Sequence, residues 1–236
     1  MTTVQLVVLC AAVLIGAFTQ GASGIGFALI FAPVAGFVDP TLLPITLLGL
    51  MLPVNLYILV RERGHVDLRG VSWISLARIV STPLGIWLLL AVPADKLGLL
   101  IGVSTIAAAV VSLASPTFTP GRVAYLAAGA VTGLSETATG VGGPPLALVY
   151  QHRPAAELRS TLALCFLIGE VASLLMLFGT GGFPHPTVPV LAAMLAVLGV
   201  GLWLSGRVHQ RISNTRLRTF VLIFAILSGL VLVVGS

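Results

Sequence analysis

The sequence has few charged residues for its length. Charged side chains make up 8% of the 236 residues, whereas a soluble domain carries about 25%. With 58% hydrophobic residues and a mean hydropathy of +1.12, the chain cannot cover a water-facing surface. The shortage of charge excludes a soluble globular domain, and the apolar excess excludes a disordered chain. We therefore expect an integral membrane protein.

Residues that bind metals or form disulfides are also scarce. Cys10 and Cys165 both lie in apolar stretches, which indicates buried small hydrophobes rather than a disulfide or a metal site. The four histidines fall in the predicted connections: His65, His152, His185 and His209. The chain contains no GxxxxGK[ST] run for ATP. We expect no metal, no cofactor and no enzymatic activity.

The charges that are present are mainly basic. The formal net charge is +5 and the pI is near 10, values that also occur in nucleic-acid-binding proteins. Here the basic residues fall between apolar stretches, as they do in the cytoplasmic loops of membrane proteins. We therefore expect the lipid bilayer and a small anionic solute as partners, and no nucleic acid.

The apolar stretches predict an all-α membrane protein. A spanning helix needs about 20 mainly apolar residues, and segments of that kind run over 41–60, 71–92, 97–114, 156–178, 187–206 and 217–235. Two other regions, 4–38 and 122–150, are each a pair of shorter apolar segments. Because the N-terminus lacks the basic region of a signal peptide, 4–18 is read as a retained span. The count is about eight transmembrane helices, or ten segments with the broken halves counted separately.

The two interrupted regions occupy matching places in an internal repeat. Gly24-Ile25-Gly26 matches Gly140-Val141-Gly142, and the same shift carries 85–88 onto 201–204. It also lays 43–60 over 159–176 without a gap. We therefore divide the single membrane domain into an N-terminal repeat, 1–116, and a C-terminal repeat, 117–236.

The basic residues orient this repeat. If each interrupted region returns the chain to its starting side, ten arginines share one face: Arg61, Arg63, Arg69, Arg122, Arg153, Arg159, Arg207, Arg211, Arg216 and Arg218. Only Lys96 falls on the other face, and Arg78 lies within a span. The positive-inside rule makes the arginine face cytoplasmic in a bacterial-type inner membrane and puts both termini outside. The halves are then inverted repeats, and inverted repeats with interrupted helices indicate a secondary transporter.

The interruptions are the candidate substrate site. Irregular backbone at membrane depth is tolerated where protein or a watery cavity satisfies it. Helices that restart at 26–27 and 144–146 would direct free N–H groups and positive dipole ends at an anion. The alternative is that the glycines only let helices cross closely. The candidate substrate-binding residues are Gln20, Ser23, Gly24, Gly26, Asn55, Arg78, Ser135, Thr137, Thr139, Gly140, Gly142, Gly143 and Pro144.

Three ionisable residues lie inside the predicted spans or breaks, where charge is costly and by default suggests function. Glu136 is either a proton carrier or a polar cap for nearby N–H groups. Arg78 either attracts the anion or neutralises Glu136 or Glu170. Glu170 aligns one position from Asn55 of the other half, so both either line the cavity or form an interhelical hydrogen bond. Glu136 and Glu170 are the proton-coupling candidates.

The two motifs also resemble those of a known family. Gly21-Ala22-Ser23-Gly24-Ile25-Gly26-Phe27 followed by Pro33, and Gly133 through the GxGGPP run at 140–145, are similar to the sulfite exporter TauE/SafE family of membrane transporters. The resemblance covers essentially the whole chain. It implies an exporter or permease for sulfur oxyanions or organosulfur compounds such as sulfite, thiosulfate or sulfonates. Phe27 and Ala28 depart from the family pattern, since many members have further glycines there, which narrows that half of the site.

The resulting hypothesis is alternating access around the two breaks, with proton coupling or none. Three alternatives remain open. The first is an anion or solute channel, the second a membrane-embedded enzyme acting on lipids, and the third a non-transporting subunit of another complex. Saturable transport with counterflow would exclude the channel, and the enzyme would need paired acidic or His-bearing metal motifs at membrane depth.

Overall fold

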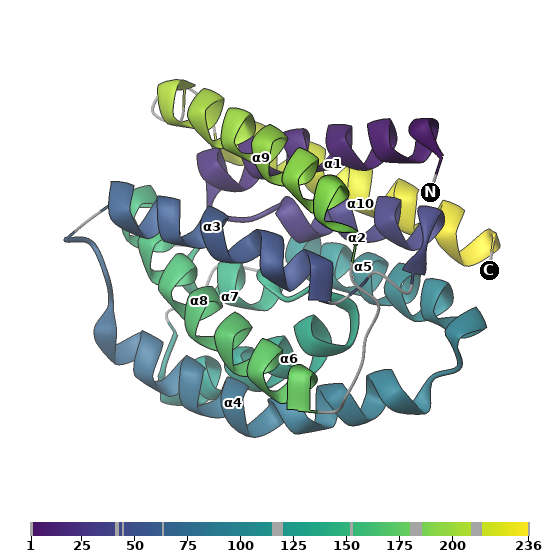
Figure 1. The fold of residues 1–236 in the computed structure, drawn as a ribbon. Helices are drawn as coiled ribbons and strands as arrows, with labels where there is room; N and C mark the ends of the chain where they lie inside the picture. The colour runs from purple at the N-terminus through teal and green to yellow at the C-terminus, as the bar shows by residue number, and fades with distance from the viewer. Residues whose placement is uncertain are drawn as a thin grey trace.

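The computed structural model describes residues 2–40, 43, 45–62, 64–114, 120–151, 153–179, 186–208 and 214–235 (Figure 1). Arg63, Arg211, His152, His185 and His209, named above, lie outside the described residues. Within these ranges the regular structure is entirely helical. The helices are α1 (Thr3–Ser23), α2 (Phe27–Val38), α3 (Ile45–Arg61), α4 (Leu68–Ala91), the short 3-10 helix η2 (Ala94–Lys96), α5 (Leu97–Ala114), α6 (Arg122–Thr139), α7 (Gly143–Tyr150), α8 (Ala155–Gly179), α9 (Val188–Val208) and α10 (Asn214–Val234).

The predicted helix breaks are confirmed at both glycine motifs. α1 ends because Gly24 adopts φ +88°, and α6 ends because Gly140 adopts φ +79°. Each glycine N–H donates to the carbonyl four residues earlier, at 2.8 Å in α1 and 2.7 Å in α6. A left-handed residue after the last helical turn suits glycine, which has no Cβ to clash. The chain then restarts as the shorter helices α2 and α7.

α7 returns the chain to the end at which α6 began. The rings of Tyr125, near the start of α6, and Tyr150, the last residue of α7, lie 5.8 Å apart. Both hydroxyls donate to the same carboxylate oxygen of Asp67, at 3.4 and 2.9 Å. The second interrupted region is therefore a pair of segments that turns back on itself, as expected.

Helices that are far apart in the sequence pack side by side. α4 lies against α6, and α9 lies against α1 (Figure 1). In the same manner, α3 packs on α8 and α5 on α10. Glycines allow close approach: a Cβ at Gly201 of α9 would come within 2.6 Å of the Leu14 carbonyl, and one at Gly133 of α6 would overlap the Arg78 carbonyl.

Five helices are long and apolar enough to cross a membrane: α1, α4, α5, α8 and α9. α2, α3 and the 219–234 part of α10 are apolar but shorter. Large hydrophobic side chains cover the outside of these helices; Val80, Trp87 and Leu175, for example, are about two-thirds exposed. An apolar exterior of this kind suits lipid rather than water.

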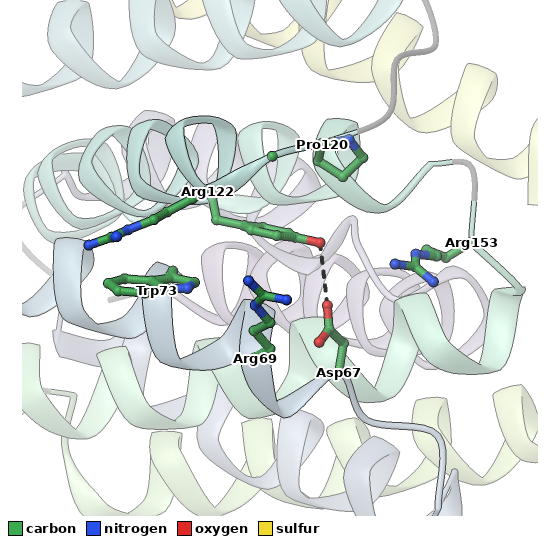
Figure 2. A pocket seen from close by; sticks show the side chains of 8 residues that line it. Asp67, Arg69, Trp73, Pro120, Arg122 and Arg153 are labelled. Atoms are coloured by element: carbon green, nitrogen blue, oxygen red, sulfur yellow. Dashed lines mark hydrogen bonds between the residues drawn. The ribbon is translucent and has the colours of Figure 1, made fainter.

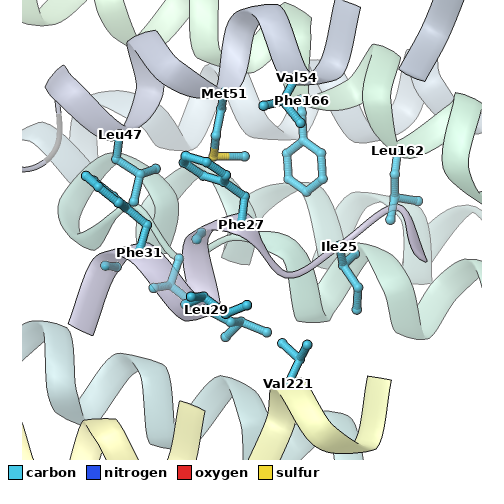
Figure 3. Close-up of a cluster of buried hydrophobic side chains, with 14 of the residues drawn as sticks. Ile25, Phe27, Leu29, Phe31, Leu47, Met51, Val54, Leu162, Phe166 and Val221 are labelled. Carbon is cyan, nitrogen blue, oxygen red and sulfur yellow. The ribbon is translucent and has the colours of Figure 1, made fainter. Parts of the chain in front are cut away.

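The main core surrounds the first break. Phe27 and Phe31 of α2 stack with ring centroids 5.6 Å apart, and they lie beside Leu47 and Met51 of α3 (Figure 3). Ile25 of the break itself is buried in the same cluster. The breaks are thus enclosed by apolar side chains and held away from water.

Candidate functional site

The two breaks have the same local hydrogen bonding. The Ser23 hydroxyl donates to the carbonyl four residues earlier, at 2.9 Å, and accepts from the Ile25 N–H at 3.4 Å. Thr139 repeats both contacts, donating four residues back at 2.8 Å and accepting from the Val141 N–H at 3.4 Å. Both candidate hydroxyls therefore shape the ends of their helices.

The second glycines of the two motifs are required for different reasons. Gly26 has φ +124°, a conformation that L side chains rarely adopt. Gly142 has φ −128°, which other residues tolerate, but a Cβ there would overlap the Glu136 carboxylate and come within 2.8 Å of the Thr132 methyl. The space that glycine leaves at Gly142 is therefore taken by Glu136.

The two breaks meet in the interior. A Cβ at Gly143 would lie 3.6 Å from the Ile25 side chain and 3.9 Å from the Phe166 ring, both ordinary contact distances. Ile25 belongs to the first break and Gly143 begins the helix after the second. Figure 3 shows Ile25 and Phe166 in this region. The two breaks that the sequence placed in one candidate site are thus in contact.

A chain of buried amides connects the first break to Glu170. The Phe27 N–H donates to the Gln20 side-chain oxygen at 3.0 Å, so it is not free for a ligand, contrary to expectation. The Gln20 amide nitrogen donates to the Asn55 oxygen at 2.9 Å. The Asn55 nitrogen in turn donates to Glu170 Oε1 at 2.7 Å. Gln20 thus caps the start of α2, because its side-chain oxygen accepts a hydrogen bond from the first N–H of that helix.

The second polar group is the ion pair of Arg78 and Glu136. Arg78 Nη2 lies 2.8 Å from Glu136 Oε2, and both side chains are completely buried. Arg78 Nη1 donates to the Cys165 carbonyl of α8 at 3.1 Å, and the guanidinium lies 5.5 Å from the Phe166 ring centroid. Of the roles left open for Arg78, the structure shows the pairing with Glu136. A buried pair is costly to desolvate, and removing one partner leaves an uncompensated charge.

Several polar atoms of this group lack an aligned hydrogen bond to the described residues. They are Arg78 Nε and Nη2, both Glu136 oxygens and Glu170 Oε2. The pairing of Arg78 with Glu136 is therefore mainly electrostatic. Buried polar atoms without a hydrogen bond are few in native proteins, so their presence marks this group as a candidate functional site.

Comparison with known families decides the assignment. The model of the sulfite exporter TauE/SafE family matches residues 8–232. The chain belongs to the sulfite exporter TauE/SafE family. No match was found among curated proteins or among solved structures. Membership implies a multi-pass membrane protein that exports sulfite or another anion.

The other predicted site residues of this TauE/SafE family member lie around the second break. The Thr137 hydroxyl is 2.9 Å from that of Ser173, across the contact between α6 and α8. Pro144 is buried in the first turn of α7, where a missing N–H costs little. Ser135 is only half-buried, and it does not join the buried polar group.

Sequence reasoning missed a charged cluster at the arginine-rich end of this TauE/SafE family member. Glu62 Oε1 lies 2.9 Å from Arg159 Nε and 3.1 Å from Arg61 Nη2, which joins the end of α3 to the start of α8. Burial opposes ionisation of Glu62, but the two arginines outweigh it and lower its pKa below the ordinary 4.5. Some of the charges predicted in loops therefore form a structural ion-pair cluster. The sequence did not reveal this pairing because Glu62 and Arg159 are far apart along the chain.

Proposed function

We propose that the protein is a secondary transporter of small anions of the sulfur oxyanion and organosulfonate class, sulfite among them. The observation that carries the proposal is the Arg78–Glu136 pair, which lies where the two breaks meet and is completely buried. Family membership supports both export and an anionic solute. Interrupted helices around a central site are typical of secondary transporters.

The proposed architecture has eight membrane crossings arranged as two inverted halves, 1–116 and 117–236. The matched breaks and the packing of α4 on α6 and α9 on α1 support this repeat. Arg69, Arg122 and Arg153 gather around one pocket, which supports a single basic face. We assign that face to the cytoplasm of a bacterial-type inner membrane, with both termini outside.

The proposed mechanism is alternating access around the breaks. We assign the structure to an occluded state of this cycle, because the residues of both breaks are buried. Uptake of a proton by Glu136 removes its charge and frees the Arg78 guanidinium for an anion. Glu170 is the second proton-coupling candidate, since it interacts electrostatically with both Arg78 and Glu136. Loss of the proton restores the ion pair and expels the anion, which couples the two movements.

The test is uptake and counterflow in proteoliposomes with labelled sulfite, sulfate, thiosulfate and small sulfonates, with and without a pH gradient. We expect saturable exchange of at least one of these anions. Transport that does not saturate and shows no counterflow would instead identify a channel. No movement of any anion by folded protein would favour a non-transport role in the membrane.

Two adjacent glycines provide matched variants for this assay. Gly142→Ala places a methyl group against Glu136 and should abolish exchange, whereas Gly143→Ala meets only ordinary contacts and should retain it. Glu136→Gln removes the titrating group, so any remaining exchange should no longer depend on the pH gradient. Unchanged pH-dependent exchange by Glu136→Gln contradicts the proton role of Glu136.

A further inference from the structure

A cavity of about 290 Å³ opens at the arginine-rich end, away from the breaks (Figure 2). Its walls come from the start of α4, the start of α6 and the connection between α7 and α8. The residues that line it are Asp67, Arg69, Trp73, Pro120, Gly121, Arg122, Tyr125 and Arg153. It brings together Arg69, Arg122 and Arg153, three of the arginines that the sequence predicts on one face, from three separate segments of the chain.

The cavity carries more positive than negative charge. Arg69 and Arg122 form no ion pair with the part of the chain that the structure describes. Arg153 is paired with Glu157 only at 3.5 Å, in a contact that is largely exposed. Exposed pairs of this kind contribute little and exchange readily. Three guanidinium groups therefore remain able to bind an anion.

The one carboxylate in the wall is already satisfied. Asp67 accepts hydrogen bonds from the Gly70 N–H at 3.0 Å, from Tyr150 at 2.9 Å and from Tyr125 at 3.4 Å. Burial opposes its ionisation, but these donors and the charge of Arg153 outweigh burial and lower the pKa of Asp67. The carboxylate oxygens of Asp67 thus accept hydrogen bonds from these donors rather than from the arginines.

The arginine in the α6 wall is held in place by an aromatic ring. The Arg122 guanidinium lies over Trp73 with its carbon 3.8 Å from the ring centroid, an arrangement that fixes the plane of the guanidinium (Figure 2). A fixed guanidinium presents its N–H fork to planar or tetrahedral oxygens without further ordering. The neighbouring Gly121 leaves room beside it, since a Cβ there would meet no atom within 4 Å.

We propose that this cavity is a second anion-binding site, which takes an oxyanion such as phosphate or sulfate. The group is carried either by a free anion or by the phosphodiester of a lipid headgroup. Arg69 lies between Arg122 on one side of the cavity and Arg153 on the other, so all three add positive charge and those nearest the bound group donate charge-assisted hydrogen bonds. The site lies outside the transport pathway proposed above, so its existence does not depend on that function.

The experiment measures binding to the full-length protein in nanodiscs of neutral lipid, by equilibrium dialysis of labelled inorganic phosphate and sulfate. We expect saturable binding that weakens as ionic strength rises. Arg122→Gln and Arg153→Gln should each weaken it roughly tenfold, since each removes one positive charge and its hydrogen-bond donors from the cavity wall. Circular dichroism and gel filtration establish that each variant is folded.

Arg207→Gln is the matched control. Arg207 lies over Trp203 at 3.6 Å, the same arrangement as Arg122 over Trp73, but it is on α9 and outside the cavity. Its loss should leave phosphate binding unchanged. Equal weakening by this control, or unchanged binding in a folded Arg122→Gln, Arg153→Gln double variant, overturns the site.

Nanodiscs that contain phosphatidylglycerol distinguish the two sources of the oxyanion. If that lipid displaces labelled phosphate from the wild type, the headgroup occupies the cavity. If labelled phosphate binds as well as it does in neutral lipid, a free anion is the ligand. Both results support an oxyanion site, whereas no saturable anion binding and no retained phosphatidylglycerol contradict it.

Discussion

Gly169 of α8 is the position at which one methyl group should separate Arg78 from Glu136. A Cβ at Gly169 would overlap Nε and Cζ of Arg78, which are the middle of its guanidinium. Arg78 is completely buried and cannot swing into water. We therefore predict that Gly169→Ala displaces the guanidinium and breaks the 2.8 Å ion pair.

The magnitude follows from the burial of both partners. Breaking a buried ion pair while leaving its charges in place costs about 3–5 kcal/mol. Alanine in a helix interior recovers about 1 kcal/mol relative to glycine. The net loss in the free energy of unfolding should therefore be about 2–4 kcal/mol, and anion exchange should be lost with it.

The assay is equilibrium unfolding in detergent, followed by exchange in proteoliposomes. Gly199→Ala is the matched control because its Cβ on α9 would meet no atom within 4 Å. That variant gains the same helix propensity without the overlap, so it should be as stable as the wild type or more stable, and it should transport normally.

One result refutes the reasoning directly. If Gly169→Ala and Gly199→Ala have the same stability and the same exchange rate, the pair is not held as described. A triple variant with Arg78→Met and Glu136→Gln added to Gly169→Ala tests the cause. Removing both charges should restore most of the stability, since apolar replacements of a buried pair are often neutral or stabilising, but it should not restore transport.

Three more predictions concern other contacts. Because the pKa of Glu62 is lowered in the folded protein, its stabilisation is present above the ordinary value of 4.5 and is lost as the pH falls through the folded pKa. The measurement is unfolding between pH 6 and pH 3, a range that includes the ordinary pKa of about 4.5. Over this range the free energy of unfolding should fall less for Glu62→Gln than for the wild type. Gly24 and Gly64 both have φ near +90°, so Gly24→Ala and Gly64→Ala should each lower the free energy of unfolding by about 1–2 kcal/mol. In thermal unfolding Gly24→Ala should be the less stable of the two, because its Cβ would also lie 3.2 Å from a nearby backbone atom. Asn55→Leu leaves the Glu170 carboxylate without its amide donor, so unfolding should show a loss of about 1–3 kcal/mol and exchange should fall.

Features that depend on neighbouring residues could be predicted from the sequence. The breaks after Ser23 and Thr139 follow from glycines that adopt left-handed backbone conformations, and no distant contact is needed to place them. The long apolar spans follow from length and composition in the same way. The burial of Arg78, Glu136 and Glu170 was also expected, since they lie within predicted spans or breaks.

Features that depend on how helices cross could not be predicted. Arg78 had three possible partners in the sequence, and only the packing of α4 on α6 and α8 selects Glu136. Gln20 was a candidate substrate ligand, yet its oxygen satisfies the Phe27 N–H. The arginine cavity was missed because Asp67, Arg122 and Arg153 are adjacent only after folding.

The hydrogen bond between Tyr150 and Asp67 makes α7 a direct connection between the second break and the arginine cavity. One end of this eight-residue helix is Gly143 at the second break, and the other end is held at the arginine cavity. A helix of that length spans about 12 Å and transmits displacement along its axis. A rearrangement at the break therefore either moves Asp67 or breaks its bond to Tyr150. Substitutions on the arginine face should for this reason alter transport without touching the transported solute.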